Sequence, residues 1–286
     1  MNGVISIFSL PHEREDIIQT LTLLNENLEN LSEDIKISLD LTYCLSPELL
    51  SEPSQVVERL EREFMRKITP LIQKFEERII RIEKGSEILG CVSQRRNTYR
   101  EFPDMDFYIW LDPDLYFLPE TLFYLTEGFR SIKELNPNSP IILTPQVPKL
   151  WDYTWDVLVH PRFRNEKHGY CYEIDPKKVV FIDEEVSVEE SPIPKFGGGW
   201  MTLLSGEVMK QIGVPEELGH YGMEDTYIMW RMRERGWKQY ILQGVVVAED
   251  YKTLPSKSIK KTMKLRDRKD EMRRYAQIGF QKLFKR

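Results

Sequence analysis

Apolar, β-branched segments alternate with helical patterns over residues 1–145, and this alternation limits the fold more than any other feature of the chain. A strand followed by a helix and another strand usually forms a parallel pair. We therefore expect an α/β fold, a mostly parallel mixed sheet flanked by helices on both faces. The expected strands are GVISIFSL (3–10), IKISLDLTYCL (35–45), FYIWL (107–111) and PIILTP (140–145).

Between these strands the chain alternates helical and short apolar segments. We expect a helix over EDIIQTLTLLNENLENL (15–31) and an amphipathic helix over 53–85, broken near Pro70 and ended by Gly85. A short strand is expected at EILGCV (87–92). Further helices are expected at SQRRNTYREF (93–102) and PETLFYLTEGFRSIKEL (119–135).

The second half of the chain begins with a region rich in aromatic residues, prolines and charges. Residues 147–193 are expected to form a mixed elaboration over the mouth of the sheet, with short strands at YCYEI (170–174) and KVVFI (178–182). Late strands are expected at WMTLLS (200–205) and YILQGVVVA (240–248), on either side of a helix at EDTYIMWRMRERG (224–236).

Composition indicates a chain that folds in a reducing compartment. With 286 residues and 41% hydrophobic residues, the chain is long enough for one large α/β domain or two small ones, with a sizeable core. No apolar run approaches the roughly 20 residues that span a bilayer, and the opening residues lack the basic n-region of a signal peptide. Cys44, Cys91 and Cys171 are odd in number and have no metal-ligand spacing, so we expect buried thiols and a cytoplasmic protein.

Charge divides the chain into an acidic domain (1–255) and a basic tail (256–286). The tail has 12 Lys/Arg against three Asp/Glu, a net charge of +9. Because the whole chain has a net charge of −6, the domain has a net charge of −15. The acidic balance argues against nucleic acid as a partner. The tail is expected to be helical, and three roles stay open: contact with the inner face of an anionic membrane, packing across the domain, or oligomerisation.

Two aspartates follow the expected strand 107–111, in FYIWLDPDLYF. A Pro-Asp turn alone would account for Asp112 and Asp114. However, ligands of open α/β sheets bind beyond the carboxyl ends of the strands, and carboxylates are the ligands that Mg²⁺ or Mn²⁺ prefer. The position therefore predicts a metal–phosphate site.

Four segments, in order over residues 3–250, make the chain resemble the GT-A glycosyltransferases, especially glycosyltransferase family 2. They are the first strand with SLPHERE, GCVSQRRN (90–97), WLDPDLYFLPETL, and the stretch from FGGGW to GMEDTYIMWRMRERGW. The second segment is similar to the Ala-Arg-Asn helix start of the family, and the third to its Asp-x-Asp motif. The resemblance implies a Rossmann-like GT-A domain that binds a nucleotide sugar.

For the metal, the resemblance implies Asp114 as the main ligand and Asp112 nearer the ribose or a metal-bound water. A further ligand late in the domain would be Glu249 or Asp250, since no histidine stands there, or water would complete the ligand shell. The metal would be Mn²⁺ or Mg²⁺, bridging the phosphates as a Lewis acid.

For catalysis, the resemblance implies Asp225 as the base that takes the proton of the acceptor hydroxyl, with Glu224 positioning the acceptor or holding the site. Acidic residues also favour helix N-termini for electrostatic reasons alone. An inverting, single-sugar transfer follows if the base role is real.

For the nucleotide, the resemblance implies a set of residues from five segments, with UDP expected and GDP possible as the carrier. Asp40 matches the family pattern least well, because LDLTYC stands where the family has an Asp-Asp-Gly-Ser turn. Arg231 would face the diphosphate or pair with a carboxylate. The set is Leu10, Pro11, Glu13, Asp40, Arg96, Asn97, Asp112, Gly198, Gly199 and Arg231.

The function expected from the sequence is transfer of one sugar from a nucleotide-diphosphate sugar to a hydroxyl of a glycan, glycolipid or lipid-linked saccharide. Alternatives are a retaining GT-A transferase, a sugar-1-phosphate nucleotidyltransferase and a non-catalytic sugar-nucleotide-binding protein. The nucleotidyltransferases carry a glycine-rich basic loop after their first strand, whereas this chain has SLPHERED. A binding protein would not need a base at Asp225.

Overall fold

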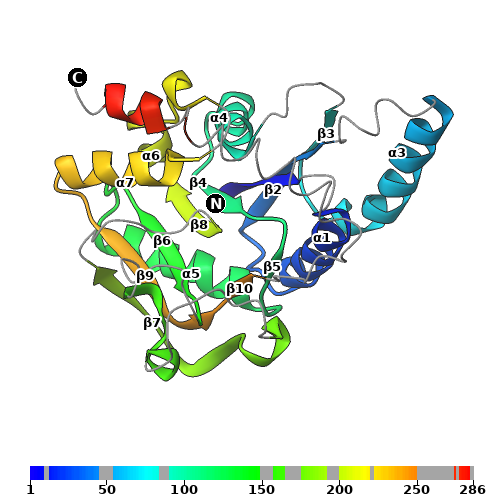
Figure 1. The fold of residues 1–286 in the computed structure, drawn as a ribbon. Coiled ribbons are helices and arrows are strands. Elements are labelled where there is room, and N and C mark those ends of the chain that lie inside the picture. The colour runs from blue at the N-terminus through cyan, green and yellow to red at the C-terminus, as the bar shows by residue number, and fades with distance from the viewer. Residues whose placement is uncertain are drawn as a thin grey trace.

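A computed structural model describes residues 1–9, 13–44, 54–83, 90–148, 157–164, 175–191, 200–219, 222–249, 274 and 277–283. Its centre is an eight-stranded mixed sheet with the strand order β3-β2-β1-β4-β8-β6-β9-β7 (Figure 1). The strands are β1 (Asn2–Ser9), β2 (Lys36–Cys44), β3 (Arg78–Glu83), β4 (Phe107–Leu111), β6 (Ile142–Gln146), β7 (Phe181–Ser191), β8 (Met201–Ser205) and β9 (Gln239–Val246).

The sheet is parallel over β3, β2, β1 and β4, and again between β6 and β9. Strand β8 runs antiparallel between β4 and β6, and β7 runs antiparallel along β9 at one edge. A separate two-stranded sheet joins β5 (Leu115–Tyr116) to β10 (Ala248–Glu249). This arrangement confirms the predicted fold class, a mostly parallel mixed sheet in a single α/β domain.

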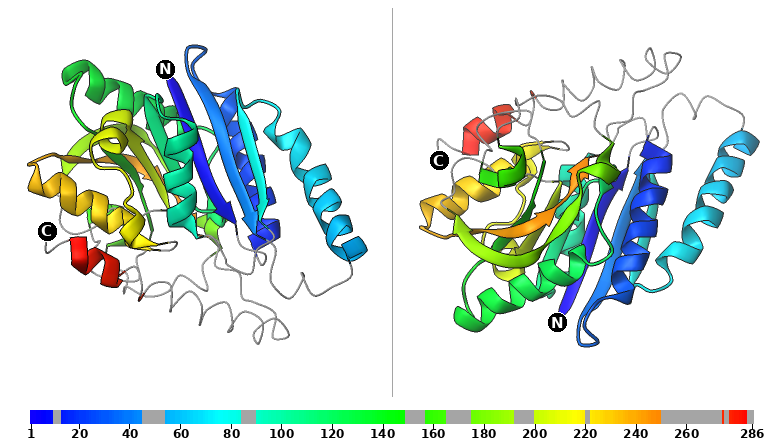
Figure 2. Two further views of the ribbon diagram at one scale, coloured as in Figure 1. Left: turned by 90° about the horizontal axis from the view of Figure 1, so that it is seen from above. Right: turned by 90° about the horizontal axis from the view of Figure 1, so that it is seen from below.

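Helices cover both faces of the sheet (Figure 2). Helices α1 (Arg14–Glu29) and α5 (Thr121–Leu135) lie on one face, and α4 (Cys91–Glu101), α6 (Gly206–Gln211) and α7 (Glu224–Glu234) lie on the other. Helix α3 (Ser54–Ile68) packs beside α1 near the β3 edge, where Phe64 stacks on Tyr43 with ring centroids 4.2 Å apart.

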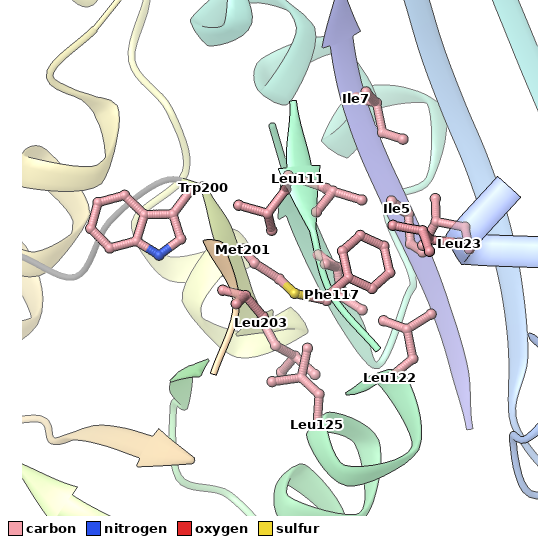
Figure 3. Close-up of a cluster of buried hydrophobic side chains, with 14 of the residues drawn as sticks. Ile5, Ile7, Leu23, Leu111, Phe117, Leu122, Leu125, Trp200, Met201 and Leu203 are labelled. Carbon is pink, nitrogen blue, oxygen red and sulfur yellow. The ribbon is translucent and has the colours of Figure 1, made fainter. Parts of the chain in front are cut away.

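Two hydrophobic cores hold these layers together. The core under α1 and α5 contains the apolar residues of Figure 3, in which Phe117 and Leu122 point toward Ile5 of β1. The core under α4, α6 and α7 is built around Tyr108 and Trp110 of β4. Alternation along β4 therefore sends successive side chains to opposite cores, and the whole strand is buried.

Two sequence predictions in this part of the chain were wrong. Residues 78–83 form the edge strand β3 rather than the end of an amphipathic helix, because pairing with β2 satisfies the backbone groups that this edge would otherwise expose. Cys91 and Val92 begin helix α4 rather than end a strand, since the extended Gly90 is its N-terminal cap. The predicted break near Pro70 is confirmed, because α3 ends at Ile68 and a 3-10 turn, η2 (Thr69–Ile72), follows.

The predicted elaboration over residues 147–193 is described only in part. The strand expected at 178–182 is correct only for Phe181 and Ile182, which begin β7; this strand extends to Ser191 and completes the main sheet, whereas Lys178 ends a 3-10 turn. The strand expected at 170–174 lies outside the described residues. Two short 3-10 turns precede β7, η4 (Pro161–Phe163) and η5 (Pro176–Lys178). A third, η6 (Glu216–Leu218), precedes α7.

The end of the basic tail packs on the domain. Residues 277–283 are helical and lie beside α7 (red in Figure 1). Phe280 contacts the rings of Tyr227 and Trp230 at centroid distances of 6.5 and 5.8 Å. A Cβ on Gly279 would lie 1.8 Å from the carbonyl oxygen of Glu217, so the segment lies directly against η6. This contact agrees with one of the three roles expected for the tail, packing on the domain, while the boundary at residue 255 stays a prediction.

Among the residues that the structure describes, no helix is both long and apolar enough to span a membrane.

Candidate active site

The two aspartates of the Asp-Pro-Asp segment lie beyond the carboxyl end of β4. The backbone N–H of Asp112 donates to the carbonyl of Trp200 at 2.8 Å, so pairing with the neighbouring chain continues one residue past the strand. The Thr20 hydroxyl of α1 donates to the carbonyl of Pro113 at 2.7 Å and fixes the turn. Asp112 and Asp114 are both half-buried. The turn is thus held from both sides, with its carboxylates at the ligand-binding edge of the sheet.

Arg95, on α4, connects this turn to the start of α7. Its Nη1 donates to Glu224 Oε1, and its Nη2 donates to Asp112 Oδ1 at 3.2 Å. The guanidinium carbon lies 4.7 Å from the centroid of the Trp110 ring. The side chains of Arg95 and Glu224 are 5% and 4% exposed. The structure thus brings together the predicted aspartate motif and the predicted Glu-Asp pair through a buried arginine.

Helix α7 begins in a sharp turn that aims its first side chains inward. Gly222 and Met223 have φ values of 88° and 71°, the left-handed region that ordinary side chains avoid. The Glu224 side chain turns into the interior, where the Cys91 thiol also donates to its Oε1 at 3.7 Å. Glu224 Oε2 is buried and has no hydrogen-bond partner among the described residues.

Asp225 differs from Glu224 in its environment. Its Oδ1 accepts from the backbone N–H of Thr226 at 2.6 Å, and the structure leaves the side chain partly exposed. Burial and the neighbouring Glu224 charge raise the pKa of Asp225 to about 7, against the smaller opposite effects of Thr226 and Arg95. A carboxyl group with a pKa near neutrality is suited to accept a proton at physiological pH.

Arg96 contacts a loop of the protein. Its Nε donates to the carbonyl of Val214 at 2.9 Å, and its Nη2 donates to the carbonyls of Pro215 and Gly219 at 2.7 and 3.1 Å. Its Nη1 lies 3.0 Å from a carboxylate oxygen of Glu216. All three nitrogens are thus engaged with the segment before α7, and the nucleotide role predicted for Arg96 stays a prediction. Its neighbour Asn97 is half-buried on α4.

Asp40 lies in the middle of β2 and is 0% exposed. One carboxylate oxygen accepts from Arg81 of β3, and the other accepts from the Thr98 hydroxyl at 2.7 Å. The Thr98 hydroxyl also lies 2.8 Å from that of Ser6 on β1. These bonds tie α4 to three strands, and the predicted contact of Asp40 with the nucleotide remains untested.

The other predicted site residues are only partly described. Glu13 is half-buried at the N-terminal cap of α1. The backbone of Glu249 pairs with Leu115, directly after Asp114, and the metal-ligand role of Glu249 stays a prediction. Leu10, Pro11, Gly198, Gly199 and Asp250 lie outside the described residues.

Arg231 lies about two turns into α7. Its Nη1 donates to Glu234 Oε2 at 2.7 Å on the same helix, and its guanidinium carbon lies 5.5 Å from the centroid of the Trp230 ring. Of the two contacts predicted for Arg231, the structure shows pairing with a carboxylate.

The described residues offer an oxygen-only donor set for a metal ion. No group of three or more His, Cys, Asp or Glu side chains suitable for a metal ion occurs among them. Asp114 and Asp112 supply carboxylates of the type that Mg²⁺ and Mn²⁺ prefer, and Arg95 already occupies one oxygen of Asp112. The ranking of Asp114 over Asp112 as the main metal ligand stays a prediction.

Sequence reasoning missed Arg95, and it considered Cys91 only as a buried thiol. Arg95 stands where the Ala-Arg-Asn pattern has its alanine, so the pattern directs attention to the next two residues. A signal was present, because a second arginine on the apolar side of a short helix needs a buried carboxylate partner. Nothing in the sequence shows that the partner would be Glu224, 129 residues away.

No family model matches the chain, and neither does any curated protein. Among solved structures, the chain is similar to GalNAc-T7 with UDP, GalNAc and Mn²⁺ (11% identity, TM-score 0.45), a match over 90% of this chain and 45% of that one. It is also similar to S. aureus TarS, with 12% identity and a TM-score of 0.49, over 93% of this chain and 39% of that one. A third match is S. aureus TarS 1–349 in complex with UDP-GlcNAc, with 11% identity and a TM-score of 0.49, over 87% of this chain and 58% of that one.

These structures are GT-A glycosyltransferases, the class that the sequence resembles. The chain spans between 39% and 58% of the length of these three solved chains. At 11–13% identity the likeness concerns the fold, so the substrates of those proteins are not transferred to this chain.

Proposed function

We propose that the protein is a metal-dependent, inverting glycosyltransferase that moves one sugar from a nucleoside-diphosphate sugar to a hydroxyl acceptor. The observation that carries this proposal is the position of Asp225. It is a partly exposed carboxyl group with a pKa raised to about 7, next to a buried Glu224 that Arg95 ties to Asp112. The proposed base therefore stands next to a residue that Arg95 connects to Asp112, beyond the carboxyl end of β4, and this is the edge where an α/β sheet binds ligands.

In this mechanism the acceptor oxygen attacks the anomeric carbon of the donor as the bond from that carbon to the diphosphate oxygen breaks. Asp225 takes the proton of the acceptor hydroxyl, and the nucleoside diphosphate leaves with the bonding electron pair. Glu224 is fixed through Oε1 by Arg95, whereas its Oε2 has no partner among the described residues. We assign Glu224 to holding the site and Asp225 to the proton.

Asp114 would hold a Mn²⁺ or Mg²⁺ ion, with Asp112 toward the ribose or a metal-bound water and the segment of Glu249 and Asp250 supplying a further ligand. The ion would supply positive charge to the leaving diphosphate. This assignment rests on the carboxylates that follow β4 and on the pairing of β10 with β5 next to Asp114.

For the donor we propose a UDP sugar, with a GDP sugar as the alternative, because the strand that carries Asp40 departs from the pattern expected at the base. For the acceptor we propose a glycan, glycolipid or lipid-linked saccharide. We place the protein in the cytoplasm, with peripheral contact at the inner face of a membrane through the basic tail. This contact is proposed from the charge of the tail, which has 12 Lys/Arg against three Asp/Glu.

The test is binding of a panel of nucleoside diphosphates and their sugars, measured by thermal shift with Mn²⁺ and again with chelator. We expect stabilisation by one nucleotide that disappears with chelator. Stabilisation by a nucleoside triphosphate but by no diphosphate would support a nucleotidyltransferase instead. No binding under any metal condition would contradict the proposal.

A further inference from the structure

Arg95 is a buried cation that contacts three separate parts of the fold. Its side chain is 5% exposed on α4, and it donates to Glu224 at the start of α7 and to Asp112 beyond the end of β4. Trp110 provides an aromatic face for the same guanidinium at 4.7 Å. Burying a guanidinium is costly unless each charge it meets is well oriented, so the position of this side chain is closely determined.

The two carboxylates that Arg95 bridges belong to the two halves of the proposed site. Asp112 precedes Asp114 on the phosphate side, and Glu224 precedes Asp225 on the acceptor side. The rigid planar fork of an arginine can donate to two carboxylates in a fixed geometry, whereas the ammonium of a lysine is a point charge on a flexible stem and does not fix that geometry. A rigid bridge of this kind sets the separation between the donor phosphates and the base.

We propose that Arg95 is a positioning residue for sugar transfer, which holds the base-bearing start of α7 in register with the aspartate turn after β4. The inference deepens the proposed function and rests on it. Arg95 acts through Glu224 and Asp112, and its replacement would let the base move relative to the anomeric carbon.

Arg95 also affects the charge of the base. The groups that face Asp225 are Glu224 and Thr226 on α7 and Arg95 on α4. The negative charge of Glu224 raises the pKa of Asp225, and the positive charge of Arg95 lowers it. Without Arg95 the base would stay protonated to a higher pH, so the acidic limb of the pH profile of kcat would move upward.

The experiment compares three variants of the full chain in transfer to water or to an acceptor, with kcat and KM for the donor measured over pH 5.5 to 9. Arg95→Met removes the charge and the bridge, and Arg95→Lys keeps the charge but not the bridge. Arg100→Met is the matched control, because Arg100 lies on the same helix and pairs at the surface with Glu216.

We expect Arg95→Met to lose kcat by about 100-fold, the size of effect that misplacement of a catalytic group can have, and to show the acidic limb at higher pH. Arg95→Lys should return the limb to the wild-type pH while kcat stays reduced. Arg100→Met should match the wild type in both.

Three outcomes would overturn the inference while wild-type transfer supports the proposed function. The first is an unchanged kcat in Arg95→Met. The second is a reduced kcat in Arg95→Met with the acidic limb of its pH profile at the wild-type pH. The third is a wild-type kcat in Arg95→Lys. If Arg95→Met does not fold, Arg95→Lys decides alone: a reduced kcat with the acidic limb at the wild-type pH supports the inference, and a wild-type kcat overturns it. A wild-type enzyme that turns over no nucleotide sugar would contradict the proposed function itself, and the inference with it.

Discussion

Replacing Asp225 by asparagine tests the environment of the proposed base without any substrate. In the folded protein the pKa of Asp225 is raised from 3.8 to about 7, first by burial and then by the Glu224 charge. Because the pKa is higher in the folded state than in the unfolded state, ionised Asp225 destabilises the fold. The stability that the protonated form provides is complete below pH 4 and is lost as the pH rises through 7.

The magnitude follows from the size of the shift. Each pKa unit corresponds to about 1.4 kcal/mol, so a shift of about three units amounts to at most about 4 kcal/mol at pH 8. At pH 5 the stability that has been lost is that of the pH interval from 3.8 to 5, about 1.6 kcal/mol. Asparagine has no charge at either pH, and its side-chain oxygen can still accept from the N–H of Thr226.

The stability advantage of Asp225→Asn over the wild type should therefore grow by about 2–3 kcal/mol between pH 5 and pH 8. Urea unfolding of both proteins at the two pH values measures this difference, because the titrations of groups that do not interact with Asp225 cancel between the two proteins. Asp104→Asn is the control, since Asp104 is an exposed carboxyl group and its replacement should give no such pH dependence. An advantage that is equal at pH 5 and pH 8 would refute the environment assigned to Asp225.

Three more predictions follow from the site and the tail. Because Asp225 must be ionised to accept a proton, wild-type kcat should fall below about pH 7, and a flat profile of kcat between pH 5 and 8 would remove Asp225 as the base. Asp114→Ala should abolish the effect of Mn²⁺ on nucleotide affinity in calorimetry, whereas an unchanged affinity with and without Mn²⁺ would exclude the ligand role. Phe280→Ala should lower the free energy of unfolding by about 1–3 kcal/mol through lost contacts with Tyr227 and Trp230, while Ile278→Ala, an exposed neighbour, should leave it unchanged.

The sequence was sufficient to predict the sheet because its strands are long, apolar and separated by clear helical patterns. The strand over 107–111 is buried on both faces, as its continuous apolar run indicates. Residues 78–83 were predicted as helix because they continue a charged, amphipathic pattern, yet they form β3. The deciding factor there is the free edge of β2, which is a tertiary effect that local propensity does not contain.

The site was predicted in its main parts but not in its connections. Asp112 and the Glu-Asp pair stand in recognisable segments, and the structure brings them to one place. The partner that joins them, Arg95, contacts residues 17 and 129 positions away, a pairing that only the fold determines. Arg96 illustrates the reverse, because a residue singled out by its motif is bound to the loop before α7.

The central claim is the transfer of a sugar from a nucleoside-diphosphate donor, and its most direct test is release of the nucleoside diphosphate from a panel of nucleotide sugars. The purified full chain would be incubated with each donor in Mn²⁺ at pH 8, with chelator and with Asp225→Asn as controls. We expect diphosphate release from one donor class that is lost in both controls. Release that persists in Asp225→Asn, or no release from any donor in Mn²⁺ or Mg²⁺, would contradict the account.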